Sequence, residues 1–333
     1  MSVCSKVTGV GFFVPDRVVT NDDLSALIDT SDEWIHQRTG IRARRHAPDG
    51  MTNVDMAEIA AKHAMDEAGI GPGDIDLLIA ATLSPDYSFP SNAPFIQRRL
   101  GLGPVAAIDV RNQCTGFLYS IAVADAYIRT GRARRVLVIG SEVQSGGLDF
   151  DSRSRDIAVI FGDGAGAFVM EAGDSSDGKG VLAVALHGDG THAEDLWTDA
   201  ERSYEHPRLT MEMYESGAVW PKMRGRAVFI QAVKELPEII NEVLAKTGHA
   251  LDDVDCFAFH QANLRINQWV GSSMNIPDEK IFNNIERYGN TTAATIPGVI
   301  FEARASGLIH DGSLVVAAAF GAGFTSAAIT IRF

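Results

Sequence analysis

Two hydrophobic patterns alternate along the chain. Residues 56–69, MAEIAAKHAMDEAG, place apolar side chains three and four positions apart and end in glycine, which predicts a helix. The next apolar run, IDLLIAATL at 75–83, is short and continuous, as expected of a strand buried on both faces. Residues 118–131 and 134–142 repeat this order of helix and strand. We therefore predict an α/β fold with a mixed sheet.

The same order of elements returns in the second half. A helical segment at 228–248 precedes the strand-like DVDCFAFHQAN, and another precedes SLVVAAAFGAG. Glycines at matching positions lie 179 residues apart at Gly69 and Gly248, and 181 apart at Gly140 and Gly321. Near 143–160 the first half has roughly 20 residues more. We predict an internal duplication, with halves at 1–172 and 173–333 that share one core.

Residues 190–222 follow neither pattern. They are rich in charged and aromatic side chains, which predicts an inserted loop with a short helix in the second half. Loops of this kind often shape binding pockets.

Charge and composition exclude several classes of protein. The net charge of −14 over 333 residues opposes binding to nucleic acid or anionic membrane. No apolar run is long enough to span a bilayer. The three cysteines, Cys4, Cys114 and Cys256, have neither the number nor the spacing of a disulfide framework or a zinc site. We expect a soluble cytoplasmic protein.

Cys114 lies in DVRNQCTGFLYS, between an apolar run and a segment that predicts a helix. Helical N–H groups and the positive end of the helix dipole would favour its thiolate and lower its pKa. The alternative is a buried structural cysteine, since free cysteines are commonly buried. Partner residues must decide between the two.

Two other stretches resemble active-site loops. His260 directly follows a predicted strand, and Asn290 lies in RYGNTTAATIP before a predicted helix. A lone histidine or asparagine in such a place is more often structural. Within the repeat, however, adding 178 to Cys114 gives Thr292, two residues after Asn290. The halves would thus present Cys114 and Asn290 near a pseudo-twofold axis.

Six ordered segments resemble the β-ketoacyl-acyl-carrier-protein synthases III, which have the thiolase-like fold. They are TSDEWIHQRTGI at 30–41, the Cys114 loop, IFGDGAGA at 160–167, HQANLR at 260–265, YGNTTAATIP at 288–297 and GAGFT at 321–325. The resemblance implies a homodimer with a duplicated fold of five layers, α-β-α-β-α.

The resemblance also implies the chemistry. Cys114 would attack an acyl-CoA thioester, and His260 and Asn290 would donate hydrogen bonds to a malonyl thioester as it loses CO2. The main-chain N–H groups of Cys114 and Gly323 would form the oxyanion hole. No metal and no cofactor is implied.

Further residues match substrate contacts of the family. Trp34, Arg38 and Arg155 match positions that bind the CoA nucleotide, and Asn263 matches a pantetheine contact. The alternative for Trp34 and Arg38 is an exposed amphipathic pair. Phe89 matches a residue that reaches the acyl tunnel of the neighbouring subunit.

The match is incomplete in three places. Gln113 and Thr115 flank the nucleophile where fatty-acid initiators usually carry small residues. Ile230 replaces a lysine that docks the acidic carrier protein, which leaves Arg265 as the predicted docking residue. Residues 200–222 fall where the family builds the outer wall of the acyl tunnel, so a wider pocket is expected.

Three functions follow from these residues. The first is decarboxylating condensation of an acyl-CoA primer with malonyl-acyl-carrier protein or malonyl-CoA, in fatty-acid initiation, a shunt or a specialised pathway. The second is a cysteine-dependent acyltransferase or thioesterase, which has little need of Asn290. The third is a non-catalytic scaffold, which has no need of any of the three side chains.

Overall fold

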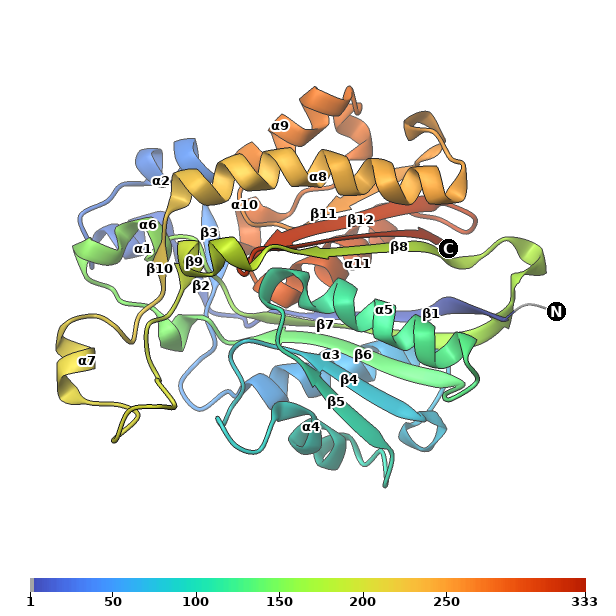
Figure 1. Ribbon diagram of the computed structural model, residues 1–333, viewed down its shortest axis with the longest axis horizontal. Helices are drawn as coiled ribbons and strands as arrows, with labels where there is room; N and C mark the ends of the chain where they lie inside the picture. Colours follow the sequence, from blue (N-terminus) through green and yellow to red (C-terminus); the bar gives the residue numbers. More distant parts are fainter. Residues whose placement is uncertain (1–2) are drawn as a thin grey trace.

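Two mixed sheets run through the computed structural model, which describes residues 3–333 (Figure 1). The first has strand order β1-β7-β6-β4-β5 and the second β11-β12-β13-β8. The strands are β1 (Val3–Phe13), β4 (Leu77–Ala81), β5 (Ala106–Val110), β6 (Arg135–Glu142), β7 (Gly164–Asp174), β8 (Gly180–Gly188), β11 (Cys256–Phe259), β12 (Leu314–Gly321) and β13 (Thr325–Arg332). Each sheet combines parallel and antiparallel pairs, as predicted.

Helices form three layers around these sheets (Figure 1). Helices α5 (Gly116–Arg129) and α11 (Thr295–Ala305) lie between the sheets. The outer face of the first sheet is covered by α3 (Asn53–Ala68) and α4 (Asn92–Leu100), and that of the second by α8 (Gly225–Thr247) and α9 (Leu264–Met274). The predicted order of five layers, α-β-α-β-α, is confirmed.

Shorter elements complete the described chain at one end of the molecule (Figure 1). They are β2 (Val18–Thr20), α1 (Asn21–Ser25), α2 (Asp32–Thr39), β3 (Ala43–Arg45), α6 (Arg155–Ala158), β9 (Leu196–Trp197), α7 (Met211–Glu215), β10 (Lys222–Met223) and α10 (Ile285–Tyr288). Within residues 3–333, no helix has the length and apolar character needed to cross a bilayer.

The internal duplication has a physical basis in matching turns. Gly69 and Gly248 both end a helix with positive φ, at 67° and 73°. Gln113 and Thr292, also 179 residues apart, hold φ of 46° and 51° in equivalent turns. The counterpart of Cys114 is therefore Ala293, and the predicted match to Thr292 was wrong by one residue. The error arose because the offset of 178 is one less than the 179 residues that separate Gly69 from Gly248.

The connections between strands differ in the two halves. Residues 143–163 join β6 to β7, whereas 322–324 join β12 to β13, which confirms the extra length predicted near 143–160. Strand β7 ends at Asp174, so the first half extends slightly beyond the predicted boundary at 172. Residues 1 and 2 of that predicted half lie outside the described range.

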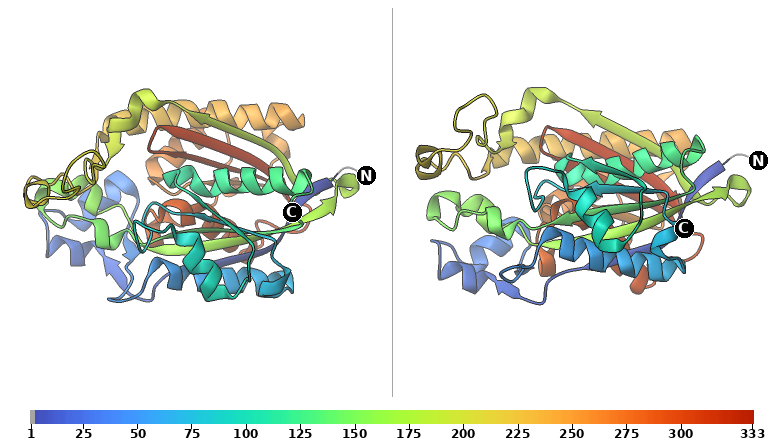
Figure 2. Two further views of the ribbon diagram at one scale, coloured as in Figure 1. Left: turned by 60° about the horizontal axis from the view of Figure 1, so that its bottom comes forward. Right: turned by 90° about the horizontal axis from the view of Figure 1, so that it is seen from below.

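The segment at 190–222 contains the predicted short helix, α7, which projects from the body of the protein (Figure 2). It lies between β8 and α8, and residues 14–52 occupy the equivalent place between β1 and α3. The segment is thus the second-half counterpart of 14–52, not an isolated insertion. The prediction missed this because the segments 14–52 and 190–222 share no sequence pattern.

The two halves share one central core, as predicted. Phe117 of α5 meets Phe168 of β7 edge to face, with ring centroids 4.9 Å apart. The same cluster includes Ile296 and Val299 of α11 and Val315 of β12, all fully buried. Helices α5 and α11 each follow an active-site turn, so this packing fixes the two turns relative to one another.

Candidate active site

Cys114 occupies a tight turn between a strand and a helix. Strand β5 ends at Val110, residues Gln113–Thr115 form a 3-10 turn, and α5 begins at Gly116. The predicted strand-turn-helix context is therefore confirmed. The predicted fall in pKa is not, because burial raises the pKa of the Cys114 thiol to about 12 and the Glu142 carboxylate adds to the rise. The sequence indicated that a helix starts after Cys114 but not how deeply Cys114 is buried. Because its pKa is raised, the thiol needs a base to remove its proton before it can react.

His260 is held by its main chain and by one ring nitrogen. Its N–H donates to the Ala318 carbonyl at 2.8 Å, and Nδ1 lies 2.6 Å from Thr295 Oγ1. The Thr295 hydroxyl donates to the Thr292 carbonyl at 3.0 Å, so Nδ1 donates to Thr295 and Nε2 carries a lone pair. Nε2 is buried and has no hydrogen-bond partner within residues 3–333. Burial lowers the pKa of His260 to about 3, so the resting imidazole is neutral.

Asn290 is oriented by its own turn. Its Oδ1 accepts a hydrogen bond from the Thr292 N–H at 2.8 Å, which leaves the Nδ2 group as the donor that faces the cavity. Its main-chain N–H donates to the Ile160 carbonyl, and Gly162 N–H donates to the carbonyl of Asn290. The IFGDGAGA segment of the first half therefore positions an asparagine of the second.

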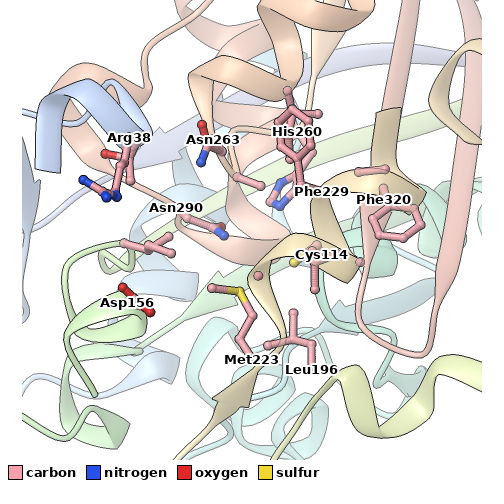
Figure 3. Close-up of a pocket in the computed structure, with 18 of the residues that line it drawn as sticks. Arg38, Cys114, Asp156, Leu196, Met223, Phe229, His260, Asn263, Asn290 and Phe320 are labelled. Carbon is pink, nitrogen blue, oxygen red and sulfur yellow. The ribbon is translucent and has the colours of Figure 1, made fainter. Parts of the chain in front are cut away.

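These three side chains meet at one cavity of about 340 Å³. Figure 3 shows the sulfur of Cys114, the imidazole of His260 and the amide of Asn290 pointing toward a common space. Trp34 lines the cavity with the charged side chains Arg38 and Asp156, which Figure 3 shows together on one side. Phe229 of α8 and Phe320 lie on the other side in this view, and Ile266, Ala232 and Leu236 add to the apolar lining. Such a cavity suits a substrate with a charged head and an apolar tail.

Comparison with known proteins gives one answer over the whole chain. The model of the family described as 3-oxoacyl-[acyl-carrier-protein] synthase III matches residues 108–190, and the model of its C-terminal part matches 244–333. β-Ketoacyl-[acyl-carrier-protein] synthases III of Chelativorans sp. and Agrobacterium fabrum are each 43% identical over 333 residues, covering 99% of both chains. The chain belongs to the β-ketoacyl-acyl-carrier-protein synthase III family.

Solved structures agree with this assignment. The 3-oxoacyl-[acyl-carrier-protein] synthase III from Aquifex aeolicus has a TM-score of 0.90 and 40% identity, and the match covers 99% of this chain and 100% of that one. A priming β-ketosynthase from a polyketide biosynthetic pathway also has a TM-score of 0.90, at 30% identity, with 99% and 96% coverage. This synthase III chain thus has the thiolase-like fold expected from its sequence.

The predicted nucleotide contacts cluster at the mouth of the synthase cavity. The guanidinium carbons of Arg38 and Arg155 each lie 4.4 Å from the centroid of the Trp34 indole. Arg155 Nη1 also donates to the Asp29 carbonyl at 2.9 Å, and Arg155 itself is not among the residues that line the cavity. Both guanidinium groups therefore pack against the indole of Trp34.

The other predicted site residues differ in whether they line the cavity. Asn263 lines the cavity, and its Oδ1 caps α9 by accepting from the Arg265 N–H at 2.9 Å. Phe89 is 88% exposed and lies outside the cavity of its own chain. Gly321, not Gly323, is the glycine of GAGFT that lines the cavity.

Arg265 has a structural role in this chain. Its guanidinium donates to the His36 carbonyl at 3.1 Å, to the Gln37 carbonyl at 2.9 Å and to Gln268 Oε1 at 2.9 Å. His36 and Gln37 belong to the last turn of α2, which carries Trp34 and Arg38. These bonds support a part in holding α2 more than a part in docking a carrier protein.

Several residues of the site were not found in the sequence. They are Asp156, Leu196, Met223, Val228, Phe229, Phe320 and Thr295. Leu196 and Met223 flank the predicted wall at 200–222, and residues 200–222 themselves do not line the cavity. The helical pattern at 228–248 gave the apolar face of α8, but not the fact that its first two turns face the nucleophile.

Gly321 must lack a side chain for Cys114 to sit where it does. A Cβ at this position would lie 2.9 Å from Cys114 Cβ and 3.2 Å from Cys114 N. We expect Gly321→Ala to slow acylation by about 100-fold, because a nucleophile moved by roughly 1 Å loses that much. The rate of acyl-enzyme formation measures this. Gly190→Ala is the control, since a Cβ there meets no atom within 4 Å, and equal rates in both variants would contradict the argument.

Proposed function

We propose that this synthase III joins an acyl-CoA primer to malonyl-acyl-carrier protein with loss of CO2, giving a β-ketoacyl thioester. The convergence of Cys114, His260 and Asn290 on one cavity is the observation that carries the proposal. Family membership supports it over the whole chain. The test is mass spectrometry of the carrier protein after incubation with both substrates. A β-ketoacyl product is expected, and transfer of the unextended acyl group would contradict condensation.

In the first half-reaction, His260 Nε2 accepts the thiol proton of Cys114, because its lone pair is free and its imidazole is neutral. The thiolate attacks the acyl carbonyl, and the tetrahedral intermediate expels CoA thiolate, which takes the proton from His260 Nε2 and leaves as the thiol. His260 is therefore neutral again in the acyl-enzyme. The raised pKa of Cys114 makes such a base necessary.

In the second half-reaction, His260 Nε2 takes a proton from water as the malonyl carboxylate enters. Nε2–H of His260 and Nδ2 of Asn290 then donate to the malonyl thioester oxygen while CO2 leaves. The carbanion attacks the acyl group on Cys114, and the sulfur departs as thiolate and recovers its proton from His260. Burial lowers the pKa of His260, so its charged form requires an anion beside it, which the malonyl carboxylate and then the enolate supply. Protons balance, with one taken from water in each cycle.

A simple acyltransferase or thioesterase is the second candidate. It would use Cys114 and His260 in the same way but would have no enolate to stabilise. The Thr292 N–H holds the amide of Asn290 with its donor toward the cavity, and this arrangement favours condensation.

Trp34 is proposed to bind the CoA nucleotide at the mouth of the cavity. We expect Trp34→Ala to raise KM for acyl-CoA about 5- to 30-fold, the equivalent of about 1–2 kcal/mol, with kcat nearly unchanged. Steady-state kinetics with varied acyl-CoA measures both constants. Trp269→Ala is a matched control, because Trp269 is an exposed tryptophan outside the cavity. An unchanged KM in the Trp34 variant would remove this residue from the nucleotide site.

We also propose a cytoplasmic homodimer. Strand β5 is an edge strand of the first sheet, with Ile108 and Val110 only partly buried. Edge strands of this kind invite pairing with a second copy, and the exposed Phe89 would then be free to reach the cavity of the partner. Light scattering that gives the 35.8 kDa of one chain, not twice this mass, would contradict the dimer.

A further inference from the structure

Two threonine hydroxyls join the halves of the protein beside the nucleophile. Thr115 Oγ1 and Thr325 Oγ1 lie 2.8 Å apart. Thr115 follows Cys114 and is fully buried, and Thr325 is the first residue of β13. Thr115 donates its hydroxyl hydrogen to the Asn112 carbonyl at 2.9 Å and accepts from Asn112 Nδ2 at 3.1 Å. Thr325 is therefore the donor in the bond between the two threonines.

The Thr325 hydroxyl also reaches the turn between β12 and β13. Its Oγ1 lies 3.4 Å from the Ala322 carbonyl oxygen of GAGFT. One hydroxyl thus contacts the turn of Cys114 in the first half and this turn in the second half. The resemblance to the family assigns the main-chain N–H of Cys114 to the oxyanion hole.

The turn that holds Cys114 needs an outside contact of this kind. Gln113 has φ of 46°, in the left-handed region that is unfavourable for residues other than glycine. Such a conformation persists only where its surroundings hold it. Among residues 3–333, the Thr325 hydroxyl is the only side-chain partner that Thr115 has outside this turn.

We propose that Thr115 and Thr325 are positioning residues that hold the turn of Cys114, and with it the oxyanion-hole N–H of Cys114, against the second half of the chain. Oxyanion donors act only when they lie within hydrogen-bond distance of the developing charge. Loss of the bond should therefore slow each step that passes through a tetrahedral intermediate without weakening the binding of CoA. The inference rests on the proposed function.

The cleanest test is Thr325→Val, which keeps the shape of the side chain and removes its hydroxyl. We expect kcat and the single-turnover rate of acylation to fall about 10- to 100-fold, with KM for acyl-CoA unchanged. Thr325→Ser should restore most of the rate. Thr330→Val is the matched control in the same strand, since the Thr330 hydroxyl is buried without a hydrogen-bond partner in the described chain, and it should keep the wild-type rate.

A double variant separates positioning from a general loss of stability. Thr115→Val and Thr325→Val remove the same bond, so the double variant should be no slower than the slower single variant. A wild-type rate in Thr325→Val would overturn the proposal, as would losses that multiply in the double variant. A wild-type protein that forms no acyl-enzyme would instead refute the proposed function, so the two failures are distinguishable.

Discussion

Cys114→Ala should abolish acyl-enzyme formation, whereas Cys4→Ala and Cys256→Ala should leave it intact. Cys114 alone among the three cysteines lines the cavity with His260 and Asn290. Intact-protein mass spectrometry after incubation with acetyl-, butyryl- and octanoyl-CoA would detect one acyl adduct on the wild type and none on the variant. An adduct on Cys114→Ala would mean that another group is the nucleophile.

The pH dependence of Cys114 alkylation tests the state of its thiol before substrate binds. Because burial raises the pKa of Cys114 to about 12, its thiolate fraction should rise about tenfold per pH unit from pH 6 to pH 10. Alkylation of Cys114 by iodoacetamide should follow the same slope, without a plateau near pH 7. A plateau near neutral pH would show an activated thiolate in the resting enzyme and would contradict the need for His260 as base.

Asn290→Ala should separate the two half-reactions. We expect acylation of Cys114 to stay within about threefold of the wild type, and condensation to fall about 100- to 1,000-fold, as for loss of one donor to a developing oxyanion. The reason is that the Asn290 amide faces the cavity only as a donor, held by the Thr292 N–H. Rapid-quench measurement of each step gives the two rates.

Asn290→Asp is the matched variant for this experiment. It keeps the size of the side chain and the acceptor for Thr292 N–H but replaces the cavity-facing donor with an acceptor. Condensation should be lost at least as completely as in Asn290→Ala. Equal loss of acylation and condensation in both variants would indicate a structural role for Asn290.

The elements of the fold could be predicted because their patterns are local. The helix that ends at Gly69 and the strand that contains Leu77–Ala81 follow from periodicity and a glycine stop, and both are confirmed. Cys114, His260 and Asn290 could be predicted as site residues because the segments that contain them resemble a known family; their places beside predicted strands and helices agreed with this but did not suffice alone. Their chemistry depended on facts that a sequence does not contain, above all how deeply Cys114 and His260 are buried.

Other features of the structure could not be predicted for the same reason. Thr295 Oγ1 lies 2.6 Å from His260 Nδ1, and Thr325 Oγ1 lies 2.8 Å from Thr115 Oγ1. Both contacts join segments far apart in the chain. Residues 190–222 could be recognised as the counterpart of 14–52 only by comparing β8 and α8 with β1 and α3 in the structure. The hydrogen bonds of Arg265 to the last turn of α2 join segments that are far apart in the sequence, so they could be recognised only in the structure.

The most direct test of the account is release of radiolabelled CO2 from carboxyl-labelled malonyl-acyl-carrier protein by the wild-type enzyme, with and without acyl-CoA. We expect CO2 and β-ketoacyl product in equal amounts when the primer is present, and loss of both in Cys114→Ala. Acyl transfer to the carrier protein or to water without release of CO2 would contradict decarboxylating condensation as the function of this cavity.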